Sequence, residues 1–595
     1  MKSIMTRQEK DILSTLLTDP FINQRILSEI SGYSLGVVNR SLKNLIKEGY
    51  LKEDISLTGQ ARKEFRTQAP KNAIILAAGF GMRMVPINTQ APKALLSING
   101  EPLIERIIRQ LHEVGIREIY VVVGFMKEQF EYLMDEFGVN LIVNENYASK
   151  NNLHSLVLAV EYLSNSYIVP CDLWCLRNPF RKNELYSWYM VSELVENASN
   201  VRVNRKMELV TIPDLSGGNA MVGISYLTEE TACIVRNKLT TFCSDSKYDD
   251  SFWEETLYEK DRMILQARIV HSADVVEINT YEQLRELDEN SDQLKSDAIL
   301  TISQRLQVGE EEISHIEVLK KGMTNRSFLF TARGTKYIMR IPGEGTGQLI
   351  NRKEEAAVYH TIRGMNLCED PVYINPENGY KITRYIEGVR CCDPLCAEDL
   401  KACMRKLRQF HNKKLHTEHT FDIFEKLEFY ESLWEGKPSV YKDYQKTKAH
   451  VLSLRKFIDD HAADKVLTHI DAVPDNFLFD DRTEGELHLQ LTDWEYAGMQ
   501  DPHVDIAMFC IYSLYNKKQI DRLINIYFEG NCPWHIHTKI YCYISACGLL
   551  WSNWCEYKRN LGVEFGEYSL RQYRYAKEYY KLAKAEMEKP NVLSS

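Results

Sequence analysis

The sequence lacks an apolar run long enough to cross a bilayer. Its most apolar late stretch, YCYISACGLLW, is short and has polar ends, and the N-terminus lacks the apolar core of a signal peptide. The fourteen cysteines show no paired zinc-ligand spacing. The group Cys391, Cys392 and Cys396 has no histidine at ligand spacing, which favours ordinary thiols over a metal site. We therefore expect a reduced, cytoplasmic protein without a membrane segment.

The sequence also lacks a repeat of fixed period, a low-complexity tract and an excess of positive charge. The formal charge of -10 argues against a chain that coats nucleic acid. Residues 1–66 are an exception, because their eleven Lys and Arg outnumber eight Asp and Glu. The length of 595 residues, 44% of them hydrophobic, predicts three or four domains with buried cores.

Two polar stretches mark the seams between domains. RTQAPKN, residues 66–72, precedes the first strongly apolar strand, and LDENSDQLKSD, residues 287–297, separates two compact patterns. We predict domains at 1–66, 72–290 and 298–595.

The first domain has the pattern of three helices followed by strands. Thr6 and Glu9 form a capping-box signature before helical apolar spacing. In a later helix Arg40, Lys43 and Lys47 share one side, and residues 50–65 suit a wing and its return. The pattern resembles a winged helix-turn-helix module, mostly α. The basic side fits either DNA binding or an ordinary solvated face, with packing or dimerisation as the module's alternative roles.

The second domain opens with an apolar strand that runs into Gly79, Gly81 and Arg83. Glycines let backbone N–H groups approach phosphate oxygens, and Arg83 and Lys93 add positive charge for a triphosphate. A tight turn after a strand also selects glycine, so the loop alone is weak evidence. Alternating strands and helices predict an α/β domain with a mostly parallel sheet, and Asp172 follows a strand where magnesium on a nucleotide would be held.

The combination LAAGFGMR, PK, NNLHSL and CD resembles nucleotidyltransferases, most closely the bacterial phosphocholine cytidylyltransferases. The resemblance implies CTP as donor, with Gly79, Gly81, Arg83 and Lys93 around the triphosphate. It further implies Asp172 and Glu277 as Mg²⁺ ligands, although the family often shows Asp where this chain has Asn279.

A quaternary ammonium cannot donate a hydrogen bond and is held by aromatic faces and a carboxylate. Phe252, Trp253 and Glu254 stand at the matching place for phosphocholine. The alternative is that both aromatic residues belong to the core. The family's other cage tryptophan has no clear counterpart here.

The third domain carries a phosphoryl-transfer pattern. Asp471 is placed to orient a hydroxyl and take its proton, while Asn476 and Asp493 are placed to hold Mg²⁺ under ATP. His469 fits a bracing residue better than a base. Glu495, two residues after Asp493, is a carboxylate that would attract an ammonium, or it pairs with a neighbouring cation.

This pattern resembles the choline/ethanolamine kinases, a two-lobed α+β branch of the protein-kinase-like fold. The resemblance implies nucleotide contacts from Gly322, Thr324 and Asn325, with Arg340 as the phosphate-side cation. Its helical partner is expected to be Glu355, with Glu354 as the other choice.

Two tryptophans near the end address substrate choice. Trp551 and Trp554 are three apart on a predicted helix, with Phe565 and Tyr568 following. They suit either a lobe core or an ammonium box; the family resemblance favours choline-binding aromatics.

Together these patterns predict a multidomain, bifunctional enzyme that phosphorylates choline with ATP and then joins phosphocholine to CTP, giving CDP-choline. One alternative is a sugar-1-phosphate nucleotidyltransferase fused to an ethanolamine or aminoglycoside kinase. Another is a transcriptional regulator that senses choline or a nucleotide and binds DNA through residues 1–66. Oligomeric state, nucleobase choice and channelling are not encoded in these motifs.

Overall fold

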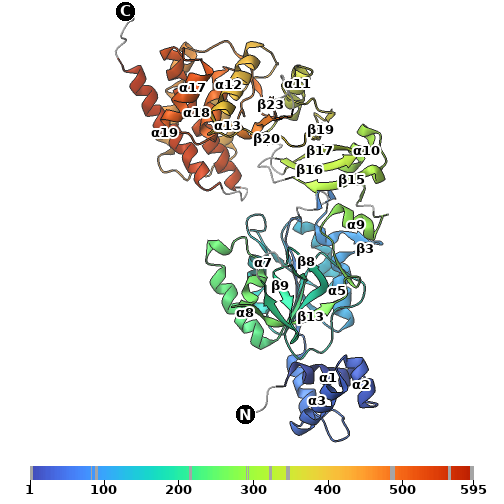
Figure 1. The fold of residues 1–595 in the computed structure, drawn as a ribbon. Helices are drawn as coiled ribbons and strands as arrows, with labels where there is room; N and C mark the ends of the chain where they lie inside the picture. The colour runs from blue at the N-terminus through green and yellow to red at the C-terminus, as the bar shows by residue number, and fades with distance from the viewer. Residues whose placement is uncertain are drawn as a thin grey trace, which may run out of the picture. The chain divides into compact units, whose positions relative to one another are not determined.

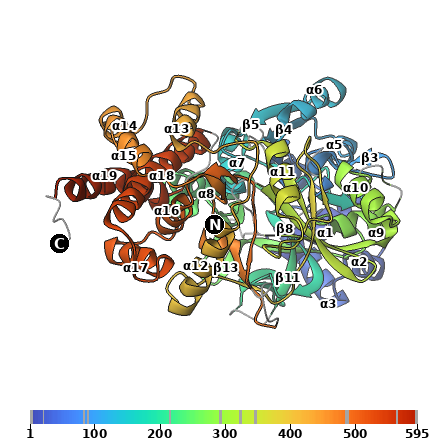
Figure 2. The same cartoon turned by 90° about the horizontal axis from the view of Figure 1, so that it is seen from above.

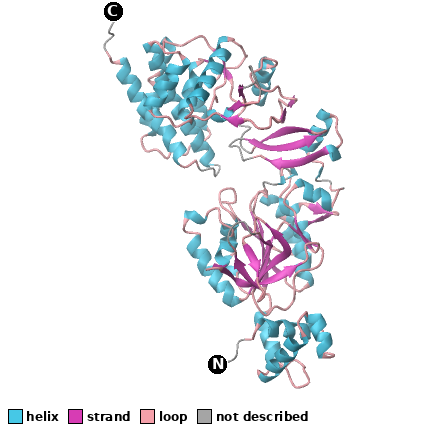
Figure 3. Ribbon diagram, in the orientation of Figure 1, coloured by secondary structure: helices cyan, strands magenta, loops and turns pink. Residues whose placement is uncertain are grey.

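The computed structural model describes residues 5–19, 21–81, 84–87, 91–212, 217–289, 291, 294–319, 325–343, 349–482, 489–560 and 565–589. The chain divides into two compact units, Met1–Ser296 and Asp297–Ser595. Figure 1 shows the elements of each, and Figure 3 shows that helices make up most of both ends of the chain.

The N-terminal module consists of four helices: α1 (Arg7–Thr18), α2 (Gln24–Ser31), α3 (Leu35–Lys47) and α4 (Gly59–Gln68). The predicted capping box is present, since the Thr6 hydroxyl accepts from Glu9 N and the Glu9 carboxylate accepts from Thr6 N. The expected winged-helix class is confirmed, but the return segment is helical. Only the bridge between Leu51 and Leu57 pairs as a wing, and Thr58 then caps α4.

Helix α1 docks on the second domain. The Asp11 carboxylate accepts hydrogen bonds from Tyr33 (2.5 Å) in its own module and from Tyr186 (2.7 Å) in the next domain. Arg7 donates to the carbonyl oxygens of Met207 (3.5 Å) and Ala267 (3.1 Å). The module is therefore held by directed polar contacts as well as by its connecting chain.

The second domain is built around a ten-stranded sheet in the order β5-β4-β1-β6-β11-β8-β13-β10-β9, with β12 paired to β13. Its strands are β1 (Asn72–Ala77), β4 (Glu118–Val123), β5 (Asn140–Val143), β6 (Ser166–Pro170), β8 (Trp188–Glu196), β9 (Val201–Val203), β10 (Glu208–Thr211), β11 (Gly218–Leu227), β12 (Tyr258–Glu259) and β13 (Arg262–Val270). Strands β5, β4, β1 and β6 are parallel, whereas β11 is antiparallel to both neighbours. The sheet is thus parallel where the nucleotide loop lies and mixed beyond it.

Helices cover both faces of this sheet. Alternate residues of β1 enter two separate cores, with Ile75 on the side of α5 (Leu103–Glu113) and Ile74 on the side of α7 (Asn152–Leu158) and α8 (Glu229–Phe242). This explains why β1 is apolar from Ala73 to Ala77 instead of alternating. The remaining elements are α6 (Tyr132–Phe137), α9 (Tyr281–Leu287), the pair β2 (Ser97–Ile98) and β3 (Glu101–Pro102), and the pair β7 (Leu173–Cys175) and β14 (Val275–Glu277).

The third domain has the two lobes of the kinase-like class. After α10 (Asp297–Leu306), the small lobe has a five-stranded antiparallel sheet in the order β15-β16-β17-β19-β18, with α11 (Arg352–Ile362) following β17. These strands are β15 (Ile313–Val318), β16 (Asn325–Ala332), β17 (Thr335–Pro342), β18 (Tyr373–Ile374) and β19 (Lys381–Arg384).

The large lobe is mainly helical. Its elements are α12 (Ala397–Asn412), α13 (Ile423–Ser432), α14 (Tyr444–Leu452), α15 (Arg455–Asp460), α16 (His503–Tyr512), α17 (Lys517–Tyr527), α18 (Trp534–Asn560), α19 (Glu567–Met587), β20 (Arg390–Cys391), β21 (Val466–Thr468), β22 (Phe477–Phe479), β23 (Leu489–Leu491) and β24 (Gly498–Gln500). Helix α18 is buried on all sides from Thr538 to Lys558 and lies beside α16 and α19 (Figure 2). A helix enclosed in this way needs no amphipathic pattern. In the described part of the chain, no helix has the length and apolarity needed to cross a membrane.

Candidate active sites

The loop after β1 lies against Lys93. Gly81 has a φ of 65°, and a Cβ there would come within 3.2 Å of the Lys93 Cβ. A side chain at this position would therefore be both strained and crowded. Parallel pairing of β1 with β6 brings the loop and Asp172 to the same edge of the sheet.

Lys93 joins two polar residues that follow different strands. Its Nζ lies 2.5 Å from Asp172 Oδ2 and 2.8 Å from Asn279 Oδ1. The other carboxylate oxygen, Asp172 Oδ1, is buried and has no hydrogen-bond partner among the residues that the structure describes. A buried carboxylate oxygen without a partner is unfavourable unless a cation or donor completes it. Asp172 thus suits Mg²⁺, which binds to few protein oxygens and retains waters or phosphate oxygens.

Asn279 is the residue of this group that sequence reasoning did not select. Strand β14 pairs with β7 so that Glu277 stands opposite Leu173, and Ile278 N donates to Asp172 O at 2.9 Å. Glu277 is exposed at the end of β14, while Asn279 reaches Lys93. The sequence signal that could have identified Asn279 was the Asp that the family often shows at this position. Ligation of a metal by Glu277 stays a prediction, and Arg83 lies outside the described residues.

The segment predicted to hold choline is fixed by the start of α7. Asn151 N donates to Asp249 O at 2.7 Å, and Asn152 Oδ1 accepts from Trp253 N at 2.8 Å. The aromatic residues differ in placement: Phe252 is 60% exposed, whereas Trp253 is 1% exposed in the core near Tyr189. Trp253 is therefore a core residue, as the alternative interpretation of this segment expected, whereas Phe252 is not.

Glu254 is a half-buried residue whose Oε2 atom is buried. Its Oε1 accepts from the Tyr189 hydroxyl at 3.0 Å, and its Oε2 has no hydrogen-bond partner in the described part of the chain. Burial raises the pKa of Glu254 to about 7. A cation beside Oε2 would favour the ionised form, so this atom fits a substrate ammonium.

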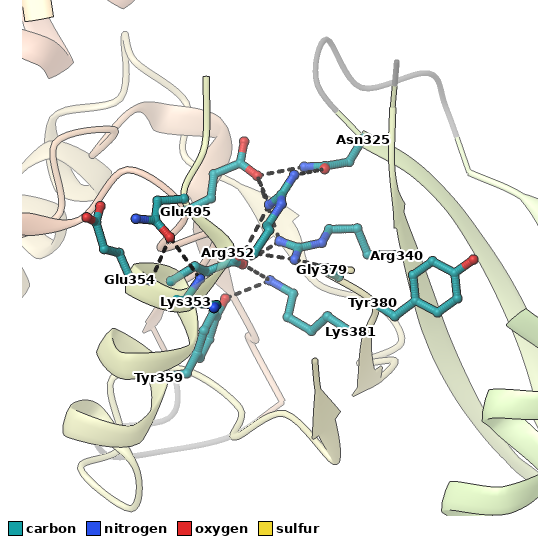
Figure 4. A network of polar contacts seen from close by, with 12 residues as sticks. Asn325, Arg340, Arg352, Lys353, Glu354, Tyr359, Gly379, Tyr380, Lys381 and Glu495 are labelled. Atoms are coloured by element: carbon teal, nitrogen blue, oxygen red, sulfur yellow. Dashed lines mark hydrogen bonds and ion pairs between the residues drawn. The ribbon is translucent and has the colours of Figure 1, made fainter. Parts of the chain in front are cut away.

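In the third domain, a buried ion-pair network surrounds Arg340 (Figure 4). The Arg340 guanidinium donates through Nη1 and Nη2 to the two oxygens of Glu355, and Nη2 also donates to Gly379 O at 2.8 Å. Glu355 faces inward and Glu354 does not. Burial alone would raise the pKa of Glu355, but Lys381, Arg340 and Arg352 lower it to about 2.

Four further residues join this network. Arg352 Nη1 lies 2.9 Å from Glu355 Oε2 and 3.2 Å from Glu495 Oε2. Asn325 Nδ2 donates to the same Glu495 oxygen at 2.8 Å. Lys381, which stands opposite Arg340 in the sheet, lies 3.5 Å from Glu355. Glu495 thus accepts from two small-lobe residues, Asn325 and Arg352, which agrees with the alternative that it pairs with a neighbouring cation. A contact between Glu495 and choline stays a prediction.

The phosphoryl-transfer residues are held by a short loop. Asn476 Nδ2 donates to Asp471 O (2.8 Å) and Oδ2 (3.2 Å), which turns its amide oxygen away. Asp493 follows β23 with a φ of 64°, a left-handed conformation uncommon for a side-chain-bearing residue. Burial, with Asp493 and Glu495 nearby, raises the pKa of Asp471 to about 8. The amide oxygen of Asn476 and the carboxylate of Asp493 are the groups available to Mg²⁺.

His469 braces the loop. Its ring is buried, Nε2 donates to Thr492 O at 2.8 Å, and its backbone N donates to Asp505 at 3.1 Å. Asp505 also accepts from Ile470 N at 2.7 Å and from the His411 ring at 2.9 Å. Sequence reasoning did not select Asp505, which fixes the backbone immediately before Asp471.

The late aromatic residues gather around the segment after Asp493. Trp551 lies 5.7 Å from the Tyr496 ring centroid and 6.4 Å from that of Trp554, and Trp554 lies 5.2 Å from that of Phe565. Tyr568 is close enough to Asp471 for that carboxylate to help burial raise its pKa. The two indoles are buried, but they pack beside the metal-site segment, as a binding wall would.

Gly322 and Thr324, which are expected to approach the nucleotide, are outside the described residues. No cluster of three His, Cys, Asp or Glu side chains suited to a metal occurs among the residues described here.

Comparison with known proteins identifies a family for each domain. Family models match residues 5–52 (winged helix-turn-helix DNA-binding), 73–183 (MobA-like NTP transferase domain) and 316–526 (choline/ethanolamine kinase). A choline-phosphate cytidylyltransferase of Streptococcus pneumoniae is 32% identical over 223 residues, 36% of this chain and 96% of the relative. Protein LicA of Haemophilus influenzae is 30% identical over 268 residues, 42% of this chain and 76% of the relative. The crystal structure of choline kinase LicA from S. pneumoniae is 28% identical, covering 48% of this chain and 97% of that one with a TM-score of 0.42.

Proposed function

This chain belongs to the MobA-like NTP transferases through its middle domain and to the choline/ethanolamine kinases through its C-terminal domain, and we propose that it makes CDP-choline in two steps. The C-terminal domain transfers the γ-phosphoryl group of ATP to choline. The middle domain then joins the phosphocholine to CTP and releases pyrophosphate.

One observation carries this proposal: in the middle domain, Asp172 Oδ1 and Glu254 Oε2 are buried carboxylate oxygens that have no hydrogen-bond partner among the described residues. The first follows β6, at the sheet edge where the nucleotide loop also lies, and suits a metal on a triphosphate. The second lies beside Tyr189 and Trp253 and suits a methylated ammonium. A nucleotide-binding edge and a cation-binding carboxylate are what a phosphocholine cytidylyltransferase requires.

Cytidylyl transfer then needs positioning without a covalent enzyme intermediate. A phosphate oxygen of phosphocholine attacks the α-phosphorus of CTP, and the bond to the pyrophosphate oxygen breaks. Lys93 carries positive charge beside Asp172, where it would stabilise the charge that develops on the phosphates. Mg²⁺ held by Asp172 would supply further positive charge to the triphosphate.

Choline phosphorylation follows from the Asp471 loop. The Asp471 carboxylate orients the choline hydroxyl and accepts its proton while the oxygen attacks the γ-phosphorus of ATP, and ADP leaves. Arg340, fixed by Glu355, provides the cation on the phosphate side. Mg²⁺ held by Asn476 and Asp493 would neutralise phosphate charge, and Trp551 and Trp554 would shelter the trimethylammonium group.

Substrate profiling tests both halves on the full chain. ADP formation is measured with choline, ethanolamine and an aminoglycoside, and CDP-product formation is measured with phosphocholine, phosphoethanolamine and glucose 1-phosphate. Asp471→Asn should abolish ADP formation and spare cytidylyl transfer to supplied phosphocholine, whereas Asp172→Asn should do the reverse. A preference for an aminoglycoside with a sugar phosphate would refute the proposal.

For the N-terminal module we propose DNA binding through α3. Its side chains Arg40, Lys43 and Lys47 are exposed, while α1 and the end of α4 contact the middle domain. A basic exposed helix in this module is the element that enters a major groove. A gel shift with the full chain at several salt concentrations tests this, with Lys43→Glu expected to weaken binding and Lys63→Glu on α4 as the control. Absence of a shift at low salt would contradict it.

A further inference from the structure

Arg352 contacts polar groups from three separate segments of the C-terminal domain (Figure 4). It lies in the first turn of α11, one helical turn before Glu355, and its Nη1 contacts Glu355 Oε2 at 2.9 Å. The same nitrogen lies 3.2 Å from Glu495 Oε2. Its Nη2 donates to Asn325 Oδ1 at 3.2 Å.

These contacts link the two lobes. Glu355 and Asn325 belong to the small lobe, where Glu355 fixes Arg340 and Asn325 begins β16. Glu495 belongs to the large lobe, two residues after Asp493. Arg352 therefore joins the partner of the phosphate-side cation to the segment that carries the metal-site aspartate.

Arg352 places its positive charge between two carboxylates, those of Glu355 and Glu495. Both carboxylates are buried, and Arg352 itself is 8% exposed. Arg352 is nearer to Glu495 than Arg340 is, because Arg340 Nη1 lies 3.8 Å from Glu495 Oε2 and Arg352 Nη1 lies 3.2 Å from it. Removing one partner of a buried ion pair is costly, so without Arg352 the Glu495 side chain should shift. Such a shift alters the segment beside Asp493.

We propose that Arg352 is a positioning residue of the kinase reaction, which sets Arg340 and Asp493 at the spacing that Mg·ATP requires by tying Glu355 to Glu495. The proposal rests on the kinase function given above. Arg352 contacts neither choline nor the attacking oxygen; it acts through its two carboxylate partners. Glu495 acts in this proposal as the ion-pair partner of Arg352 and not as a choline ligand, so loss of Arg352 should weaken the nucleotide site and spare the choline site.

Steady-state kinetics of the full chain test this with Arg352→Met and Arg352→Lys. We expect Arg352→Met to raise the KM for Mg·ATP about tenfold or more, because small misplacements of a transferring group are costly. The KM for choline should change less than twofold. Arg352→Lys keeps the charge but lacks the planar fork, so its KM for Mg·ATP should be intermediate.

A double variant separates positioning from general destabilisation. If Arg352 acts through Glu495, Arg352→Met with Glu495→Gln should be no worse for Mg·ATP than Arg352→Met alone, since neighbouring residues in one network are not additive. Lys353→Met is the matched control, because Lys353 is exposed on the same helix and its one ion pair among the described residues is with exposed Glu377. Its kinetics should match the wild type.

Thermal shifts provide a readout that does not depend on turnover. Mg·ATP should raise the melting temperature of the wild type and of Lys353→Met, and markedly less that of Arg352→Met. An unchanged KM for Mg·ATP in Arg352→Met and Arg352→Lys would overturn the proposal, as would an equal rise in the KM for choline. If Arg352→Met fails to fold, Arg352→Lys and Glu495→Gln decide the same question. Failure of the proposed kinase function would appear separately, as absence of ADP formation by the wild type.

Discussion

Arg340 and Glu355 form a buried two-point ion pair, in which Nη2 lies 2.9 Å from one carboxylate oxygen and Nη1 contacts the other. The pair spans from a strand to a helix and uses one N–H of each terminal nitrogen of the guanidinium. Nη2 uses its other N–H for Gly379 O, and Arg340 Nε has no partner among the described residues. The Arg340 donors left for a phosphate are therefore Nε–H and the second N–H of Nη1.

The Arg340–Glu355 geometry predicts that lysine cannot replace Arg340. Arg340→Lys loses one of two charge-assisted hydrogen bonds, each worth about 1.5–3 kcal/mol, so kcat/KM for ATP should fall about tenfold or more. Initial rates of ADP formation provide the measurement. Arg384→Lys, at the exposed end of β19, is the control; equal rates for Arg340→Lys and Arg384→Lys would contradict this prediction.

Glu254 predicts a pH dependence of phosphocholine binding. Its pKa is raised to about 7 by burial, so Glu254 is increasingly protonated as pH falls below 7. A cation binds the ionised form more tightly, and the KM for phosphocholine in cytidylyl transfer should therefore fall as pH rises from 6 to 8.

The variant Glu254→Gln separates this effect from titration of the substrate phosphate. Its KM should be higher than that of the wild type and should keep only the pH dependence that the substrate itself contributes. A wild-type profile that matches the variant profile would show that Glu254 does not bind the ammonium.

Trp554 predicts selectivity for a methylated ammonium. A desolvated cation–π contact is worth about 2 kcal/mol, so Trp554→Ala should raise the KM for choline about 30-fold. The KM for ethanolamine should rise less, because a primary ammonium relies more on hydrogen bonds. Parallel kinetics with both substrates check this, and an equal loss for choline and ATP would indicate a folding role.

The position of Lys558 predicts that replacing it with a neutral residue strengthens choline binding. It is 4% exposed, its ammonium lies 5.8 Å from the Trp554 ring centroid, and burial lowers its pKa. Because like charges repel strongly in a poorly solvated site, Lys558→Met should lower the KM for choline about threefold or more. Arg559→Met, one residue further on, is the control, and a raised KM for choline in Lys558→Met would disprove the repulsion.

The sequence was sufficient where a local pattern determines a contact. The amphipathic pattern of α11 selected Glu355 over Glu354, and the structure turns Glu355 inward. The Thr6 capping box and the class of each domain likewise follow from local signals and short motifs. In these cases neighbours in sequence decide the geometry.

Contacts between distant segments could not be predicted in the same way. Asn279 reaches Lys93 because β14 pairs with β7 in one register, and Lys381 reaches Glu355 because β19 lies beside β17. Arg352 was in principle visible, since it precedes Glu355 by one helical turn. The signal for Glu495 was ambiguous, because an acidic residue beside a metal site suits either a substrate cation or a buried arginine.

The central claim is that one chain carries out both steps. The direct measurement incubates the full chain with choline, ATP, CTP and Mg²⁺ and follows products by mass spectrometry. We predict phosphocholine first and then CDP-choline, with Asp172→Asn stopping at phosphocholine and Asp471→Asn forming CDP-choline only when phosphocholine is supplied. If the wild type forms neither product from choline, or if one variant abolishes both reactions, the account is contradicted.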